Sequence, residues 1–259
     1  MSKSYRRWTG LGLGVILIGT TALSACDTQS NVTPETEAET TPPAATATME
    51  MGKGEGGESS HAIGTLPIEK RVAFMSGHVA TGLALYRAGA PAEAAPHLLH
   101  PVSETHASER AGIDALGFQA DVFEAVSTAL EEGRSAAEIE PMLQAAEQNI
   151  ALIRANAGGD PVDIISYLMD TIVEEYTIGV TDGAITDPGE YQDAFGFALI
   201  ALDVAKPLTG EAAARTVSEL ETLVAMWPEG GPLAASTPQP VSEVVAQTSR
   251  VHSSLYDLR

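Results

Sequence analysis

From Pro67 onward, apolar residues recur at steps of three and four, and this spacing constrains the fold more than any other feature of the chain. The first such segment runs from Pro67 to Gly89. Further helical segments are predicted at 92–111, 118–132, 136–156, 161–181, 188–205, 209–226 and 240–255. Because this period places apolar side chains on one helix face, and no alternating run is long enough for a sheet, we predict an all-α fold. It would be a helical bundle of about seven or eight helices, as one domain or two small bundles packed together.

The N-terminus has the pattern of a secretory signal. Lys3, Arg6 and Arg7 precede the apolar run LGLGVILIGTTAL, which ends at the small residues of LSAC. That tetrapeptide resembles the lipobox of bacterial lipoproteins, in which the cysteine is acylated after cleavage. Cys26 is the only cysteine of the chain, so an internal disulfide cannot explain it. We therefore predict a lipoprotein signal peptide at 1–25 and lipidation of Cys26, the alternative being a cleaved signal beside a stray thiol.

The segment after the predicted lipid differs in composition from the rest of the chain. Residues 26–65 are rich in Thr, Pro, Glu and Gly and contain no aromatic residue. Such a composition buries too little apolar surface to order itself, so we predict a disordered tether followed by a helical domain at 66–259. Asp27 resembles the residue that retains some lipoproteins at the inner membrane. The expected location is the cell envelope, lipid-anchored in the periplasm with the inner membrane favoured.

The net charge restricts the possible partners. The chain has 14 basic and 35 acidic residues, a net charge of −21, and loss of residues 1–25 would make it more negative. Nucleic acid and anionic headgroups are therefore excluded as favoured partners, whereas cations are attracted.

The stretch PHLLHPVSETH carries the candidate metal ligands. His97, His100 and Glu104 stand at i, i+3 and i+7, one face of a continuous helix, although Pro101 predicts a kink or restart there. His78 lies on the preceding segment, which the short connection AGAPAE should pack antiparallel. Nitrogen and carboxylate ligands suit zinc, iron, copper or manganese without choosing among them, and we expect iron, zinc or copper. Structural histidines on amphipathic helices are the alternative.

A second candidate site is acidic. Asp170 and Glu174 stand one turn apart on one predicted helix, and Glu190 and Asp193 stand one turn apart at the start of the next. A hairpin of these helices would gather the carboxylates, which hard cations or iron accept. Helix capping is the competing explanation, since acidic residues near helix N-termini also stabilise the macrodipole.

Two stretches resemble known families. EEYTIGVTDGAITDPGEYQDAFGFALIA resembles the helical periplasmic segment that precedes the membrane domain of some bacterial iron permeases. GHVATGLALYRAGAPAEAAPHLLHPVSE is similar to little-characterised helical periplasmic proteins of proteobacteria, which share a His-Pro-x-x-Glu step. The resemblance covers about residues 66–206 and implies an extracytoplasmic helical protein that handles metal, with a membrane transporter or permease as its partner. A permease membrane domain is absent from this sequence, so transport itself is not implied.

Two classes of function remain from the sequence. The first is a periplasmic lipoprotein that binds a transition metal ion or its complex, in metal uptake. The alternative is a non-catalytic helical interaction or scaffold lipoprotein with structural histidines. An enzyme is not expected, because no Ser or Cys nucleophile has a recognisable setting and no Gly-rich phosphate loop follows a strand.

Overall fold

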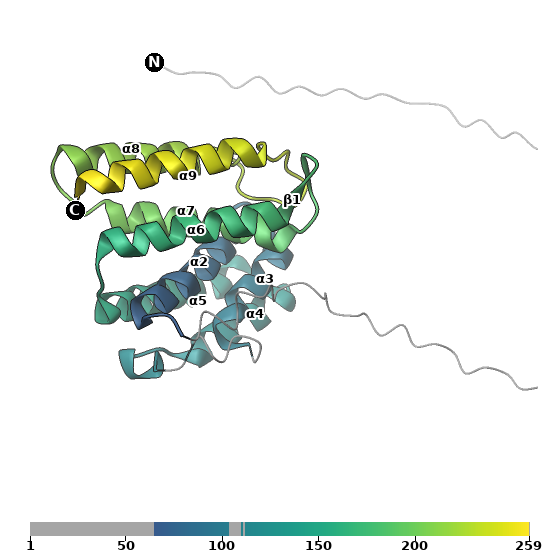
Figure 1. The fold of residues 1–259 in the computed structure, drawn as a ribbon. Helices are drawn as coiled ribbons and strands as arrows, with labels where there is room; N and C mark the ends of the chain where they lie inside the picture. Colours follow the sequence, from purple (N-terminus) through teal and green to yellow (C-terminus); the bar gives the residue numbers. More distant parts are fainter. Residues whose placement is uncertain (1–64, 104–109, 111, 259) are drawn as a thin grey trace, which may run out of the picture. The chain divides into compact units, whose positions relative to one another are not determined.

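The described residues fold into eight α-helices, as the ribbon in Figure 1 shows. The computed structural model describes residues 65–103, 110 and 112–258. The helices are α2 Ile68–Arg87, α3 Pro91–Leu99, α4 Ala120–Glu131, α5 Ala136–Ala157, α6 Pro161–Gly179, α7 Pro188–Ala205, α8 Glu211–Val224 and α9 Val241–Leu255. Three 3-10 turns are η1 His100–Val102, η3 Asp114–Leu116 and η4 Tyr256–Leu258. The predicted all-α class is confirmed. The predicted signal peptide, and the predicted tether up to residue 64, lie outside the described residues.

Helix starts follow the capping chemistry of the sequence. Asp160 accepts a hydrogen bond from the amide of Val162, and Asp187 accepts one from the amide of Gly189. In both cases a proline follows as the first helical residue, where its missing amide costs nothing. Ser135 forms a capping box with Glu138 at the start of α5. Local sequence therefore fixes where α5, α6 and α7 begin.

The predicted helix at 92–111 is wrong in its length. Helix α3 ends at Leu99 and continues only as the single turn η1, after which Ser103 has extended backbone with φ −60° and ψ 148°. The physical reason is Pro101, which has no amide to donate to the carbonyl of His97, so the α-helical hydrogen bonds are interrupted there although His100 keeps helical angles. His97 and His100 keep their one-turn spacing, while Glu104 lies outside the described residues.

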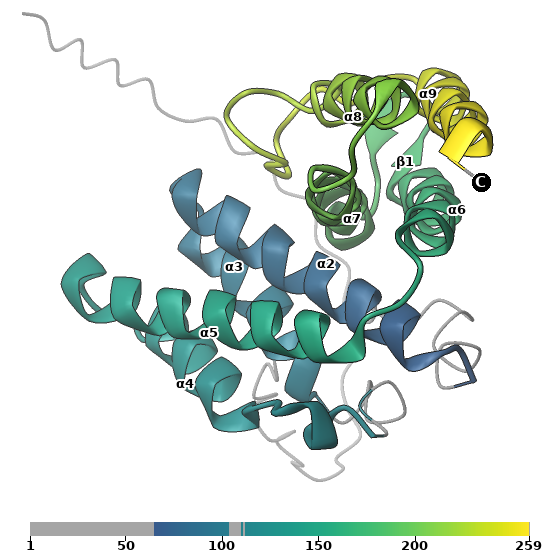
Figure 2. The same ribbon diagram turned by 90° about the vertical axis from the view of Figure 1, so that its left-hand side faces the viewer.

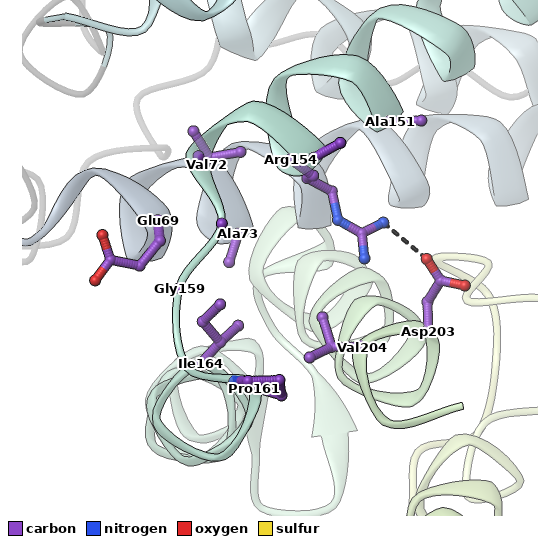
Figure 3. A pocket seen from close by; sticks show the side chains of 13 residues that line it. Glu69, Val72, Ala73, Ala151, Arg154, Gly159, Pro161, Ile164, Asp203 and Val204 are labelled. Carbon is purple, nitrogen blue, oxygen red and sulfur yellow. Dashed lines mark hydrogen bonds and ion pairs between the residues drawn. The ribbon is translucent and has the colours of Figure 1, made fainter. Parts of the chain in front are cut away.

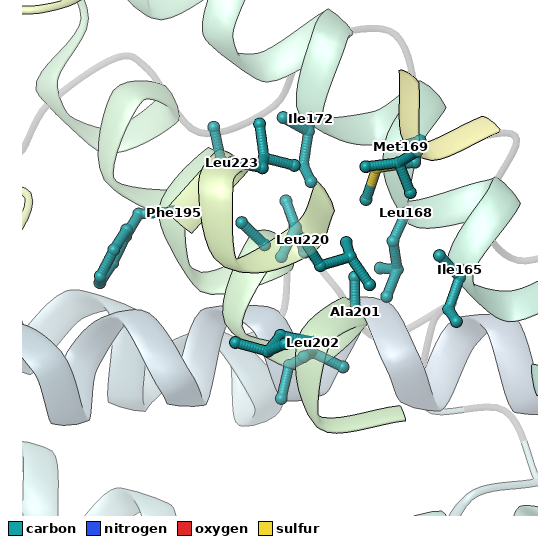
Figure 4. Close-up of a cluster of buried hydrophobic side chains, with 14 of the residues drawn as sticks. Ile165, Leu168, Met169, Ile172, Phe195, Ala201, Leu202, Leu220 and Leu223 are labelled. Carbon is teal, nitrogen blue, oxygen red and sulfur yellow. The ribbon is translucent and has the colours of Figure 1, made fainter. Parts of the chain in front are cut away.

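The described part has two hydrophobic clusters that together belong to one compact unit. One cluster is formed mainly by α2 to α5, and the other mainly by α6 to α9. Figure 2 shows α6 to α9 end-on as a group of four, with α2, α3 and α5 running across the view. Figure 4 shows the second cluster, where side chains of α6, α7 and α8 meet. Its labelled members are Ile165, Leu168, Met169, Ile172, Phe195, Ala201, Leu202, Leu220 and Leu223. Among the described helices, none is both long and apolar enough to cross a membrane.

The two clusters meet where α2 crosses α7, and glycines permit a close approach there. A Cβ added at Gly196 would lie 2.2 Å from the carbonyl oxygen of Gly77, closer than any side-chain carbon tolerates. Thr81 Oγ1 donates to the carbonyl oxygen of Gln192 across the same crossing. This crossing sets which residues of α2 face which residues of α7.

A short hairpin connects α6 to α7. Strands β1 Val180–Thr181 and β2 Ala184–Ile185 pair antiparallel through a two-residue turn. Asp182 and Gly183 both have positive φ, 53° and 77°, the conformation that Asp-Gly favours in a type I′ turn. The hairpin brings the end of α6 beside the beginning of α7, where the predicted acidic residues lie.

Candidate metal centre

Three of the predicted ligands lie together in the structure. His78 of α2, His97 of α3 and His100 of η1 are all buried, with 3, 1 and 5% of their surface exposed. The fourth member of this cluster is Asp193 of α7, which is 2% exposed. The sequence placed Asp193 in the separate acidic site. One residue of the predicted acidic site therefore joins the predicted histidines, and we call these four residues the His–Asp cluster.

The ligand atoms of the His–Asp cluster converge on one carboxylate oxygen. The Nδ1 atoms of His78 and His97 each lie 2.9 Å from Asp193 Oδ1. The His100 ring stacks on the His78 ring, with centroids 3.5 Å apart and planes 11° apart. One ligand atom each from His78, His100 and Asp193 lie within 4.8 Å of one another. Three side chains from three elements thus present nitrogen and oxygen donors to one small volume, and His97 contacts the carboxylate of that group.

Aromatic residues form the wall of the His–Asp cluster. Phe74, one turn before His78 on α2, meets its ring edge-on at 4.6 Å, and Phe197 of α7 meets the same ring at 5.3 Å. Phe74 and Phe197 stack on each other at 5.0 Å. These rings exclude water on one side of the imidazoles, and charge interactions strengthen in such a low-dielectric setting.

The charge of Asp193 is held by the histidines. Burial alone would raise its pKa, but the charges and hydrogen bonds of His78 and His97 outweigh burial and hold the pKa well below its usual range. Asp193 is therefore an ionised carboxylate inside the protein. A buried carboxylate of this kind requires positive charge beside it.

The predicted acidic residues separate into two groups. Glu190 lies one turn before Asp193 on α7, and the charge of His78 acts on it. Asp170 and Glu174 are exposed on α6. Asp170 lies 3.2 Å from Nε2 of His252 of α9 instead. The structure brings together Glu190 and Asp193 and leaves Asp170 outside.

Glu175 is the acidic residue that the sequence analysis missed. It is 5% exposed, and its side chain hydrogen-bonds to that of Glu190. Burial, followed by that hydrogen bond and the charge of Glu190, raises the pKa of Glu175. Burial also raises the pKa of Glu190. The spacing could have identified this residue, because Ile172, Glu175 and Gly179 stand at steps of three and four on the buried face of α6.

A separate surface pocket lies between α2, α5, α6 and α7, as Figure 3 shows. Its charged groups are Glu69, Arg154 and Asp203, and Arg154 already donates to Asp203 at 2.8 Å across the pocket. The other lining side chains are mostly small or aliphatic. This pocket gathers no set of metal-ligating atoms comparable to the His–Asp cluster.

Part of the chain matches a known family model. Helices α6 to α9 each pack against two neighbours and close a four-helix bundle, to which α2 and α3 add the histidines. Residues 160–258, which contain all four bundle helices, match the family model described as the iron permease-associated 4-helix bundle domain. The resemblance of this part of the chain to the helical segment of iron permeases is thereby confirmed. The resemblance predicted for residues 66–159 stays a prediction. Searches of curated proteins and of solved structures gave no match.

Proposed function

We propose that this protein is a periplasmic lipoprotein that binds a transition metal ion at the His–Asp cluster and acts in iron uptake. The ligands are His78, His100 and Asp193, whose ligand atoms lie within 4.8 Å of one another, with His97 as the fourth beside Asp193. Glu190 and Glu175 lie beside this site, where the charge of Asp193 acts on both. The protein would bind and hand over its metal, without chemical conversion of a substrate.

The observation that carries the proposal is the convergence of two imidazole nitrogens on one buried carboxylate oxygen. Donor atoms around one tetrahedral ion with bonds of about 2.0–2.2 Å lie roughly 3–3.5 Å apart. The two Nδ1 atoms lie 2.9 Å from Asp193 Oδ1, and one ligand atom each from His78, His100 and Asp193 lie within 4.8 Å of one another, so the side chains must move closer together to hold an ion. In the metal-free protein, protons on the imidazoles can supply the same positive charge. Metal and protons would therefore compete for the site.

The donor set limits the metal. Imidazole suits zinc, copper, iron and nickel, while a carboxylate beside it favours the harder members of that group. Calcium and magnesium prefer all-oxygen sites and are poor candidates here. The match of residues 160–258 to an iron permease-associated domain favours iron among the remaining metals. We expect ferrous iron as the physiological ion, with zinc and copper able to occupy the same ligands.

The expected anchor and partner follow from the sequence and the family match. Lipidation at Cys26 would hold the chain at the membrane through its N-terminus, and the inner membrane is favoured. An iron permease or another membrane transporter is the proposed partner, because the matched domain is described as associated with such permeases. A binding lipoprotein at that location would deliver its ion to the transporter.

The first test is metal content and affinity of the full chain. Elemental analysis of protein purified without added metal should find iron or zinc, and calorimetric titration should find one tight site. Replacing His97 and His100 together by Ala should lower the affinity by more than the roughly 10–100-fold that loss of an outer-shell partner costs. His252→Ala is the matched control, because His252 also pairs with an aspartate but on α9.

The outcome of this titration separates the two functions predicted from the sequence. If the wild-type protein binds iron, zinc and copper no tighter than millimolar, the His–Asp cluster is a structural ion-pair network. The protein would then be a helical interaction or scaffold lipoprotein. If the double variant keeps wild-type affinity while Glu190→Gln abolishes it, the carboxylates rather than the histidines form the site.

A further inference from the structure

A chain of polar contacts leads away from the His–Asp cluster through His97. The Nε2 atom of His97 lies 2.9 Å from Oε1 of Gln192, on the opposite side of the ring from Asp193. Gln192 Nε2 in turn donates to Oε2 of Glu93 on α3. Glu93 Oε2 also accepts from the amide of Ala234, in the segment between α8 and α9.

The donor and acceptor of each hydrogen bond in this series follow from its last member, the backbone amide of Ala234. The amide of Ala234 can only donate, so Glu93 Oε2 is an acceptor. The amide group of Gln192 must then present its NH₂ to Glu93 and its oxygen to His97. That oxygen accepts only, so the proton of this contact belongs to His97 Nε2. The Nδ1 atom, which faces Asp193, is the remaining nitrogen, and a metal ion can replace a proton there.

Two consecutive residues of α7 hold the two sides of one imidazole. Gln192 meets Nε2 and Asp193 meets Nδ1, and all three side chains belong to residues with no more than 3% of their surface exposed. Thr81 of α2 fixes the backbone at this point by donating to the carbonyl oxygen of Gln192. The ring of His97 therefore cannot turn without breaking a buried hydrogen bond at Nε2 and a buried ion-pair contact at Nδ1.

We propose that Glu93 and Gln192 are positioning residues that hold His97 with its proton on Nε2, so that Nδ1 is presented beside Asp193 to the metal ion. The metal in this statement rests on the proposed function, whereas the position of the proton concerns the metal-free protein as well. A ligating histidine usually has its second nitrogen fixed by an oxygen acceptor, which sets the tautomer and the orientation of the ring. Here Gln192 provides that oxygen, and Glu93 fixes which end of the amide faces the ring.

The test exchanges the two partners while preserving every donor and acceptor. In Gln192→Glu a second carboxylate faces Glu93, and this variant should lose roughly 10–100-fold in zinc affinity. In the double variant Glu93→Gln, Gln192→Glu, the new glutamine can accept from Ala234 and donate to the new glutamate, which still accepts from His97. The double variant should therefore recover most of the wild-type affinity. Gln247→Glu is the matched control, because Gln247 is buried and its Nε2 also donates to a glutamate, Glu219, far from the cluster.

A spectroscopic measurement tests the proton directly and stays independent of affinity. In the ¹⁵N spectrum of the metal-free wild type, His97 Nε2 should carry a proton, and addition of zinc should shift the Nδ1 resonance while Nε2 stays protonated. Gln192→Met keeps the volume of the side chain but removes both hydrogen bonds, so the proton of a neutral His97 should move to Nδ1, beside the Asp193 carboxylate. This variant also covers the case in which Gln192→Glu does not fold.

The outcomes separate this inference from the proposed function. A wild type that binds no zinc but has its His97 proton on Nε2, lost from that position in Gln192→Met, supports the positioning role and rejects the metal. A wild type with the neutral proton on Nδ1 overturns the positioning role. So does a Gln192→Met variant with unchanged spectrum and affinity, or a double exchange that binds no better than Gln192→Glu alone.

Discussion

Gly196→Ala tests whether the crossing of α2 and α7 sets the geometry of the metal centre. The added Cβ would lie 2.1 Å from Thr81 Oγ1 and 2.2 Å from the carbonyl oxygen of Gly77. Ordinary contact begins at 3.4 Å, so the two helices must separate by about 1.2 Å to reach it from 2.2 Å. Backbone atoms cannot rotate away as a side chain can. The contact between His78 and Asp193, now 2.9 Å, would lengthen with this separation.

The expected cost is the balance of two effects. Overpacking a close contact destabilises by about 1–3 kcal/mol, while alanine recovers up to about 1 kcal/mol of helix propensity relative to glycine. A net loss of roughly 1–2 kcal/mol corresponds to a fall in melting temperature of roughly 2–8 °C for a domain of this size. Binding sites require ligand positions within about 0.5 Å, so zinc affinity should fall more steeply than stability.

The assay is thermal unfolding followed by circular dichroism, together with calorimetric zinc titration of the full chain. Gly230→Ala is the control, because a Cβ at Gly230 meets nothing within 4 Å. The control should keep both the wild-type melting temperature and the wild-type affinity. If Gly196→Ala has the same melting temperature and the same zinc affinity as the control, the idea that this helix crossing determines the geometry of the site is refuted.

Three further changes test other parts of the account. Because burial and Glu190 raise the pKa of Glu175, the folded state holds a proton that the unfolded state releases, so stability falls as pH rises above the ordinary value of about 4.3. Glu175→Gln should therefore raise the melting temperature at pH 7 but not at pH 4, and an equal rise at both would contradict the ionisation argument. Zinc affinity of the wild type should fall below about pH 6.5 as the imidazoles gain protons, and a flat profile between pH 5 and 8 would argue against imidazole ligands. Cys26→Ser should move the protein out of the membrane fraction, and its retention there would show that lipid is not the anchor.

Local patterns predict the helices and half of the site. The three-and-four spacing gives the helical class, and the short connection between α2 and α3 brings His78 beside His97 and His100. Asp193 is recognisable as an inward residue of a helical hairpin, but nothing local indicates that its hairpin faces the histidines. The reason is physical. Helix α7 has buried residues on all of its faces, so its hydrophobic pattern does not indicate which face meets α2.

The histidines and the carboxyl groups of the site come from different halves of the described chain, and we infer different roles for these halves. The bundle helices that match the iron permease-associated domain contribute Asp193, Glu190 and Glu175, three carboxyl groups that act on one another electrostatically. His78, His97 and His100 come from α2, α3 and η1, before the matched residues begin. Carboxylates buried together destabilise a fold unless protons or cations neutralise them. The preceding helices therefore supply the groups that take either a proton or a metal ion beside those carboxylates. Affinity and pH dependence of the centre should follow from α2, α3 and η1, while the bundle supplies the charge that attracts the cation.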